Sequence, residues 1–161
     1  MPQAPLFKVK IFIASDHAGF ELKRALIDHL KLKGHDVEDC GAKTFDKDDD
    51  YPDFIYPCAQ KVVSNPGSFG IILGASGQGE AIVANKAKGA RAALFYGGNL
   101  DIVRRSKDHN DCNILSLGAS YLSGDEAKEA VDLWLETQFT GEERHARRVE
   151  KIERVDRVEN G

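Results

Sequence analysis

The sequence predicts an α/β protein built on a doubly wound, parallel sheet of five strands. Five short segments rich in β-branched and apolar residues recur along the chain, segments of helical periodicity separate them, and glycine-rich or polar turns follow several of them. Strands that alternate with helices form parallel sheets, and such sheets bind ligands beyond the carboxyl ends of their strands. The length of 161 residues suits a single domain covering residues 1–161.

The expected strands are short apolar runs. Residues 9–14 (VKIFIA) and 69–73 (FGIIL) are typical of strands buried on both faces. The five strands are expected at residues 9–14, 36–40, 69–73, 91–96 and 114–117.

Helices are expected between these strands. The first ends at Gly34, Asp53 is expected to cap the second with Pro57 in its first turn, and Ser123 or Gly124 lies near the cap of a long amphipathic helix. The expected helices cover residues 20–33, 53–63, 80–88, 100–107, 125–139 and 142–158. The last helix is heavily charged and would project from the domain, so we expect it to pack on a partner subunit.

Composition and charge exclude several classes of protein. A hydrophobic share of 42% supports a core, while a net charge of −4 without a long basic run argues against nucleic acid as a partner. No apolar stretch approaches the roughly 20 residues that span a bilayer, and residues 1–6 lack the layout of a signal peptide. Cys40, Cys58 and Cys112 are scattered, which fits a reducing cytoplasm. The acidic segment 41–50 is expected to be a solvated loop.

Residues 15–19 (SDHAG) follow the first strand, where a parallel sheet binds its ligands. Ser15 or Asp16 could simply cap the next helix. A cap does not require the adjacent His17, however, and an Asp-His pair at a strand end can exchange protons or bind a sugar hydroxyl. Both interpretations remain open from the residues alone.

Residues 74–80 (GASGQGE) follow the third strand and contain more glycines than a tight turn needs. Their backbone N–H groups could face one point at a helix start and stabilise negative charge there. The spacing matches neither a dinucleotide fingerprint nor a P-loop. Glu80 is either a first-turn acid favoured by the helix dipole or a base beside the anion cradle.

Two polar groups lie in the second half of the chain. His109 and Asn110 stand at an expected helix end, where the dipole alone would favour a histidine. Arg144 and Arg148 are four residues apart, on one helical face. They form either a solvated charged face or a phosphate clamp, since the guanidinium fork matches phosphate oxygens.

Together these segments resemble the ribose-5-phosphate isomerase B family, which also includes the galactose-6-phosphate isomerase subunits. The resemblance covers nearly the whole chain. Its motifs are SDHAGFELK (15–23), YPD (51–53), GASGQGEAIVANK (74–86), HNDCNILSLG (109–118) and RHARRV (144–149).

The resemblance implies a Rossmann-like sugar-phosphate isomerase that forms a homodimer or a tetramer, with active sites at the subunit interface. Proton transfer between adjacent carbons requires neither a metal nor another cofactor, so none is expected. Asp16 and His109 would assist ring opening. Residues 75–79 would form the anion hole, and His109 and Asn110 would reach in from the partner subunit. The substrate-binding residues that it implies are Asp16, His17, Ala75, Ser76, Gly77, Gln78, Gly79, Asn110, Arg144 and Arg148, with the two arginines and His17 on the phosphate.

Two positions bear on the chemistry. One branch of the family uses a cysteine base just before the glycine-rich turn, and this chain has Gly74 at that position. The other branch uses a glutamate at the end of the turn, which Glu80 matches. Glu80 is therefore assigned as the base. Ser120 stands where many members carry an arginine, so this chain lacks one phosphate or hydroxyl contact that those members could make.

The expected reaction moves a proton between two adjacent carbons of a phosphorylated sugar. A carboxylate base takes a proton from C2 of the sugar and returns it at C1, while Ser76 can hydrogen-bond the two oxygens that change charge. We expect conversion of ribose 5-phosphate to ribulose 5-phosphate. The alternatives are an isomerase of a related tetrose or hexose phosphate and, from another class of protein, a non-catalytic sugar-phosphate sensor.

Overall fold

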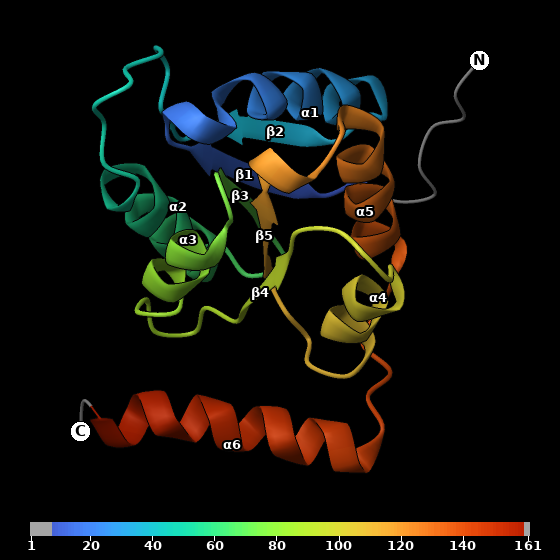
Figure 1. Cartoon of the computed structure of the whole chain (residues 1–161). Coiled ribbons are helices and arrows are strands. Elements are labelled where there is room, and N and C mark those ends of the chain that lie inside the picture. The colour runs from blue at the N-terminus through green and yellow to red at the C-terminus, as the bar shows by residue number, and fades with distance from the viewer. Residues whose placement is uncertain (1–7, 160–161) are drawn as a thin grey trace.

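The computed structural model describes residues 8–159, in which five parallel strands form one sheet (Figure 1). The sheet order is β2-β1-β3-β5-β4, and every neighbouring pair is parallel. The predicted fold class is therefore confirmed, and each strand lies within about one residue of its predicted bounds. The strands are β1 (Lys10–Ser15), β2 (Asp36–Asp39), β3 (Phe69–Gly74), β4 (Ala92–Phe95) and β5 (Ile114–Gly118).

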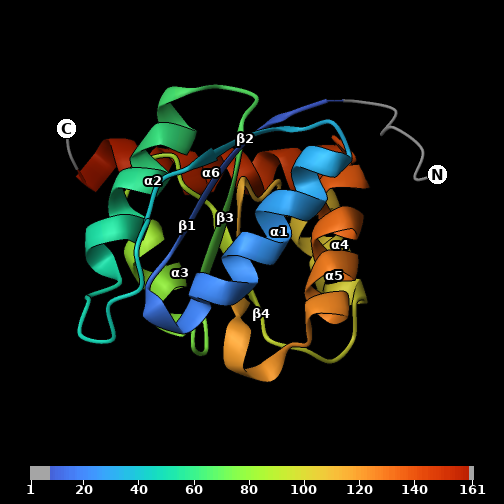
Figure 2. The same ribbon diagram turned by 90° about the horizontal axis from the view of Figure 1, so that it is seen from above.

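Helices cover both faces of the sheet, with α1, α4 and α5 on one face and α2 and α3 on the other (Figure 2). The alternation of side chains along β1 explains why both faces are covered. Ile11 and Ile13 join the apolar cluster beneath α1 and α5, whereas Phe12 and Ala14 join the cluster beneath α2 and α3. The helices are α1 (Phe20–Leu32), α2 (Pro52–Ser64), α3 (Gln78–Ala84), α4 (Asp101–Asp108), α5 (Gly124–Glu136) and α6 (Glu143–Glu159), with short 3₁₀ turns η1 (His17–Gly19) and η2 (Ala119–Tyr121).

The start of α2 differs from the prediction. Tyr51 occupies the N-cap position and Pro52 begins the helix, so Asp53 lies in the first turn and is not the cap. Pro52 suits the first helical position because the N–H that it lacks would have no partner there. Pro57 consequently lies inside the helix, beyond its first turn.

The ends of α3 and α5 also differ from their predicted positions. Helix α3 starts at Gln78, two residues early, because Gly77 adopts a left-handed φ of +79° and turns the chain directly into the helix. Helix α5 ends at Glu136 because Thr137 is extended. Its predicted Ser123 cap is confirmed, with the Ser123 hydroxyl accepting from the Glu126 N–H at 3.1 Å.

The three cysteines carry free thiols, as expected. They are not all separate in space, however, since Cys40 packs against buried Cys58 in the cluster beneath α2. Within the described residues, none of the helices is long and apolar enough to cross a membrane. Residues 1–6, considered above for a signal peptide, lie outside the described range.

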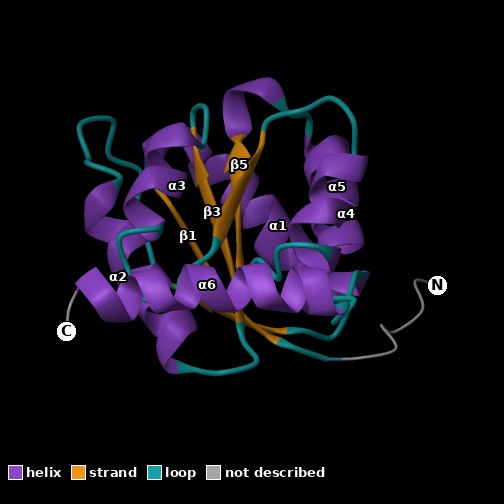
Figure 3. Cartoon of the chain, turned by 90° about the horizontal axis from the view of Figure 1, so that it is seen from below, coloured by secondary structure: helices purple, strands orange, loops and turns teal. Residues whose placement is uncertain are grey.

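Helix α6 runs along the amino-terminal edge of the sheet, at the bottom of Figure 1 and across the front of Figure 3. Arg91, just before β4, pairs with Glu153, and the Gly89 N–H donates to Asp156 at 2.8 Å. These contacts hold one side of α6 to its own chain. Its apolar side chains Ile152 and Val155 remain exposed.

Candidate active site

The candidate site opens where β1, β3 and β5 end. Ser15 pairs with Leu73 and Gly74 pairs with Gly118, so the turns that follow these three strands meet at the upper edge of the sheet in Figure 1. This is the edge at which a parallel α/β sheet binds ligands.

Glu80 is a buried acid at this edge. It lies in the first turn of α3 and is only 4% exposed. A Cβ built on Gly74 would lie 1.8 Å from Glu80 Oε2, so the carboxylate occupies the space that any side chain at position 74 would need. Burial raises the pKa of Glu80, the negative charge of Asp16 raises it further, and a hydrogen bond to its own N–H partly offsets both. A carboxyl group in this environment suits proton transfer near neutral pH.

The glycine-rich turn beside Glu80 requires glycine at its centre. Gly77 combines a φ of +79° with close packing, since a Cβ there would lie 2.7 Å from the Leu94 side chain and 2.9 Å from the Leu117 backbone. The buried Ser116 hydroxyl donates to the Gly77 carbonyl at 2.7 Å. The turn thus packs closely against Leu94 of β4 and is hydrogen-bonded to Ser116 of β5, and these contacts fix its backbone conformation.

The outer side of the same turn borders solvent. The Ser120 N–H donates to the Ala75 carbonyl at 2.9 Å, and the Gln78 N–H lies 3.3 Å from the Ser76 hydroxyl. Ala75 and Gln78 are exposed, while Ser76 and Gly79 are half-buried. The predicted cradle residues 75–79 therefore lie together next to Glu80, and all of them except the buried Gly77 are at least partly accessible.

Asp16 fills the capping role that its position suggested. Its carboxylate accepts from the Ala18 N–H at 3.0 Å and so caps η1, and the side chain is buried. It also lies close enough to Glu80 to act on the pKa of that residue. The cap thus places a fixed negative charge beside the buried acid.

His17 meets a residue that the sequence interpretation missed. Asp49 Oδ1 lies 2.6 Å from His17 Nδ1 and accepts from the His17 backbone N–H at 3.1 Å. The hydrogen bond to Asp49 raises the pKa of His17, against the opposing effect of burial. The Asp49 side chain is only 7% exposed, so the expectation of a fully solvated acidic loop is wrong at this position.

Asp16, His17 and Asp49 are also the group within residues 8–159 that could hold a metal ion. One ligand atom from each lies within 4.8 Å of the others. The Asp16 carboxylate accepts from the Ala18 N–H, and the Asp49 carboxylate accepts from the His17 N–H, so hydrogen bonds account for the positions of both carboxylates.

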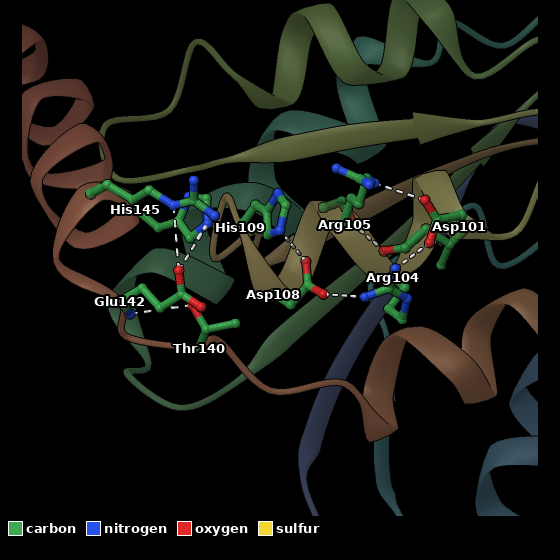
Figure 4. A network of polar contacts seen from close by, with 11 residues as sticks. Asp101, Arg104, Arg105, Asp108, His109, Thr140, Glu142 and His145 are labelled. Atoms are coloured by element: carbon green, nitrogen blue, oxygen red, sulfur yellow. Dashed lines mark hydrogen bonds and ion pairs between the residues drawn. The ribbon is translucent and has the colours of Figure 1, made fainter.

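The other predicted site residues follow α4 or lie on α6, at the opposite edge of the sheet, and Figure 4 shows His109 among its neighbours there. His109 caps the carboxyl end of α4, with Nε2 3.6 Å from Asp108, and its ring stacks on His145 at a centroid distance of 4.2 Å. His145 is buried beside Glu142, and burial together with the nearby His109 lowers its pKa. Asn110 follows His109 and is exposed.

Arg144 and Arg148 extend this second group along α6. Both are exposed, and they stand one helical turn apart. Arg144 Nε lies 3.4 Å from Glu142, whereas the neighbouring Arg147 is paired with Glu143 at 2.9 Å. The guanidinium groups of both arginines are therefore accessible from solvent, where an anion could bind them.

One chain thus carries two half-sites. The first half-site, at the carboxyl edge, contains Asp16, His17, residues 75–79 and Glu80, and the second, at the amino edge, contains His109, Asn110, Arg144 and Arg148. His17 and the two arginines, which were expected to bind the same phosphate, are not close together within one chain. The reason is that α4 and α6 place the second half-site at the amino edge of the sheet, opposite His17.

Comparisons with known proteins agree with this fold. The Ribose/Galactose Isomerase family matches residues 11–152. A ribose-5-phosphate isomerase B of Mycobacterium leprae is 40% identical over 150 residues, covering 93% of this chain and 91% of its own.

Solved structures are equally similar. A ribose-5-phosphate isomerase B of Clostridium thermocellum superposes with a TM-score of 0.88 at 41% identity, covering 94% of this chain and all of its own. That of Mycoplasma genitalium, solved with bound ribulose 5-phosphate, gives a TM-score of 0.88 at 39% identity, covering 92% of this chain and 97% of its own.

The fold and these matches define a sugar-phosphate isomerase that interconverts an aldose and a ketose. The chain belongs to the Ribose/Galactose Isomerase family.

Proposed function

We propose that this protein converts ribose 5-phosphate to ribulose 5-phosphate, with Glu80 as the catalytic base. The observation that carries the proposal is the buried Glu80 carboxylate, which fills the space over Gly74 beside the glycine-rich turn. Relatives at about 40% identity over most of the chain bear the name ribose-5-phosphate isomerase B, which supports the choice of substrate.

In the proposed reaction the sugar ring opens first, assisted by Asp16 and His109. Glu80 then takes the C2 proton, the C2–H electron pair forms a C1=C2 double bond, and the C1 carbonyl pair moves onto O1 to give an enediolate. A proton passes from O2 to O1, and C2=O forms as Glu80 returns its proton to C1, which leaves the ketose and the ionised Glu80. The backbone N–H groups of residues 75–79 and the Ser76 hydroxyl stabilise the oxygens that carry the developing charge. The raised pKa of Glu80 brings its basicity closer to that needed for carbon acid chemistry at neutral pH.

We further propose that each chain folds as a single domain and that each active site is formed by residues of both chains of a homodimer. The position of the second half-site beneath the sheet and the exposed apolar side of α6 support this arrangement. A second chain would supply His109, Asn110 and the phosphate-binding arginines Arg144 and Arg148. The free thiols fit a reducing cytoplasm as the compartment.

A related tetrose or hexose phosphate is the second candidate substrate. Ser120, in place of an arginine, is exposed on η2 with its N–H bound to the turn, so it adds no positive charge at this edge. The loss of one guanidinium would alter which hydroxyl or phosphate position is recognised.

Assaying phosphorylated tetroses, pentoses and hexoses for aldose–ketose conversion tests the proposal. We expect the highest kcat/KM with ribose 5-phosphate, and Glu80→Gln is the negative control for each sugar. A wild-type protein that binds these sugars without converting any would refute the isomerase proposal and favour a sensor.

A further inference from the structure

The segment 43–51 brings two side chains onto His17. Asp49 Oδ1 lies 2.6 Å from the ring Nδ1, and the Phe45 ring meets the imidazole edge-on at a centroid distance of 6.3 Å. The same Asp49 oxygen also accepts from the His17 backbone N–H. One acidic side chain therefore fixes both the backbone and the ring of a proposed phosphate ligand, and Nε2 is the ring nitrogen that remains for substrate.

The burial of Asp49 indicates what charge its partner carries. The Asp49 side chain is 7% exposed, and its second oxygen, Oδ2, is buried without a hydrogen-bond partner among the described residues. A buried carboxylate is costly unless a positive group pairs with it. The contact at 2.6 Å to Nδ1 is short, as expected for a charge-assisted hydrogen bond with an imidazolium.

We propose that Asp49 is a positioning residue that holds His17 in its protonated form, so that Nε2–H donates to the phosphate of the substrate. The inference rests on the proposed function, in which His17 contacts that phosphate. Asp49 itself touches no reacting atom. Its role is to keep the donor charged and oriented at pH values where a free histidine is largely neutral.

The other charged groups around His17 act in the same direction. Asp16 and Asp46 both raise the pKa of His17 through their negative charge, after the larger effect of Asp49. Glu80 lies at the same edge, close enough to Asp16 for their charges to interact. Asp49 is therefore the group whose removal should change the charge of His17 most.

The first test measures the charge on His17 directly. An NMR titration of the His17 ring, assigned with a His17→Gln variant, should give a wild-type pKa above the ordinary value of about 6.5. Asp49→Asn should lower that pKa, whereas Asp48→Asn, which removes the same charge from an exposed neighbour in the loop, should change it little. A wild-type pKa at or below the ordinary value overturns the proposal, even if Asp49→Asn does not fold.

The second test measures KM for ribose 5-phosphate against pH. Wild type and Asp49→Asn should have similar KM values near pH 5.5, where His17 is protonated in both proteins. Toward about pH 7.5 the KM of Asp49→Asn should rise to about tenfold that of wild type, the loss expected for one charge-assisted hydrogen bond, with kcat nearly unchanged.

A double-mutant cycle separates this role from a purely structural one. In the His17→Gln background, Asp49→Asn should add almost no further rise in KM, because the group that it positions is already absent. Equal effects of Asp49→Asn with and without His17, or a KM ratio that does not change with pH, would overturn the inference. Failure of the proposed function is distinguishable, since wild type itself would then not convert ribose 5-phosphate.

Discussion

The substitution Gly74→Ala, which adds one methyl group, tests most directly whether Glu80 is the catalytic base. Glu80 itself is retained, but its carboxylate must move to make room for the methyl group. A Cβ at position 74 would lie 1.8 Å from Glu80 Oε2, 2.1 Å from Cδ and 2.3 Å from Oε1. Ordinary van der Waals contact begins near 3.4 Å, so the carboxylate must retreat by about 1.6 Å. A misplacement of roughly 1 Å costs about a hundredfold in rate, so Gly74→Ala should lower kcat at least about a hundredfold.

The assay is the conversion of ribose 5-phosphate, with folding checked by circular dichroism and thermal unfolding. Gly124→Ala is the matched control, because a Cβ at Gly124 meets no atom within 4 Å and kcat should stay at the wild-type value. In a Glu80→Gln background, Gly74→Ala should cause little additional loss. A folded Gly74→Ala enzyme with wild-type kcat would refute the placement of the base.

Three further predictions address the base, the assembly and the phosphate. Glu80→Gln should lower kcat by about 10²–10⁴-fold in steady-state assays, and a smaller loss would exclude Glu80 as the base. Because the folded-state pKa of Glu80 is raised, its ionisation costs stability as pH rises. Glu80→Gln should therefore raise the Tm at pH 7, with the difference vanishing below about pH 4, and an unchanged Tm would contradict the burial argument. Mixing Glu80→Gln chains with His109→Ala chains should restore up to about a quarter of wild-type activity, since each mixed dimer contains one intact site. No recovery after verified subunit exchange would place each site within one chain. Arg144→Ala and Arg148→Ala should each raise KM about tenfold or more, while Arg147→Ala, which loses an arginine already paired with Glu143, should raise it less. Equal effects at all three positions would indicate diffuse electrostatic attraction.

The sheet could be predicted from the sequence because its strands are buried on both faces. In β1 and β3 almost every residue must be apolar, and this requirement appears in the sequence as an uninterrupted run. Helix ends were less predictable, since they depend on single positions. Pro52 and Asp53 can both start a helix, and only the path of the chain decides between them.

The acidic loop was interpreted wrongly at Asp49 for a related reason. Composition predicts that a run of carboxylates is solvated, and for Asp46 and Asp48 this is correct. Asp49 is buried because the loop folds back over the end of β1 and brings it against His17, which lies 32 residues earlier in the chain. No local pattern contains information about that contact.

By itself the sequence determined the five strands, the order of its motifs and the kinds of side chain available at the strand ends. Only the tertiary structure decided that the Glu80 carboxylate fills the space over Gly74, and that α4 and α6 carry His109 and the arginines to the opposite edge of the sheet. The physical reason is that the spacing of apolar residues along one helix or strand shows only which of its faces is buried. The distance between two side chains depends instead on how the elements pack, and that is set by the whole core at once.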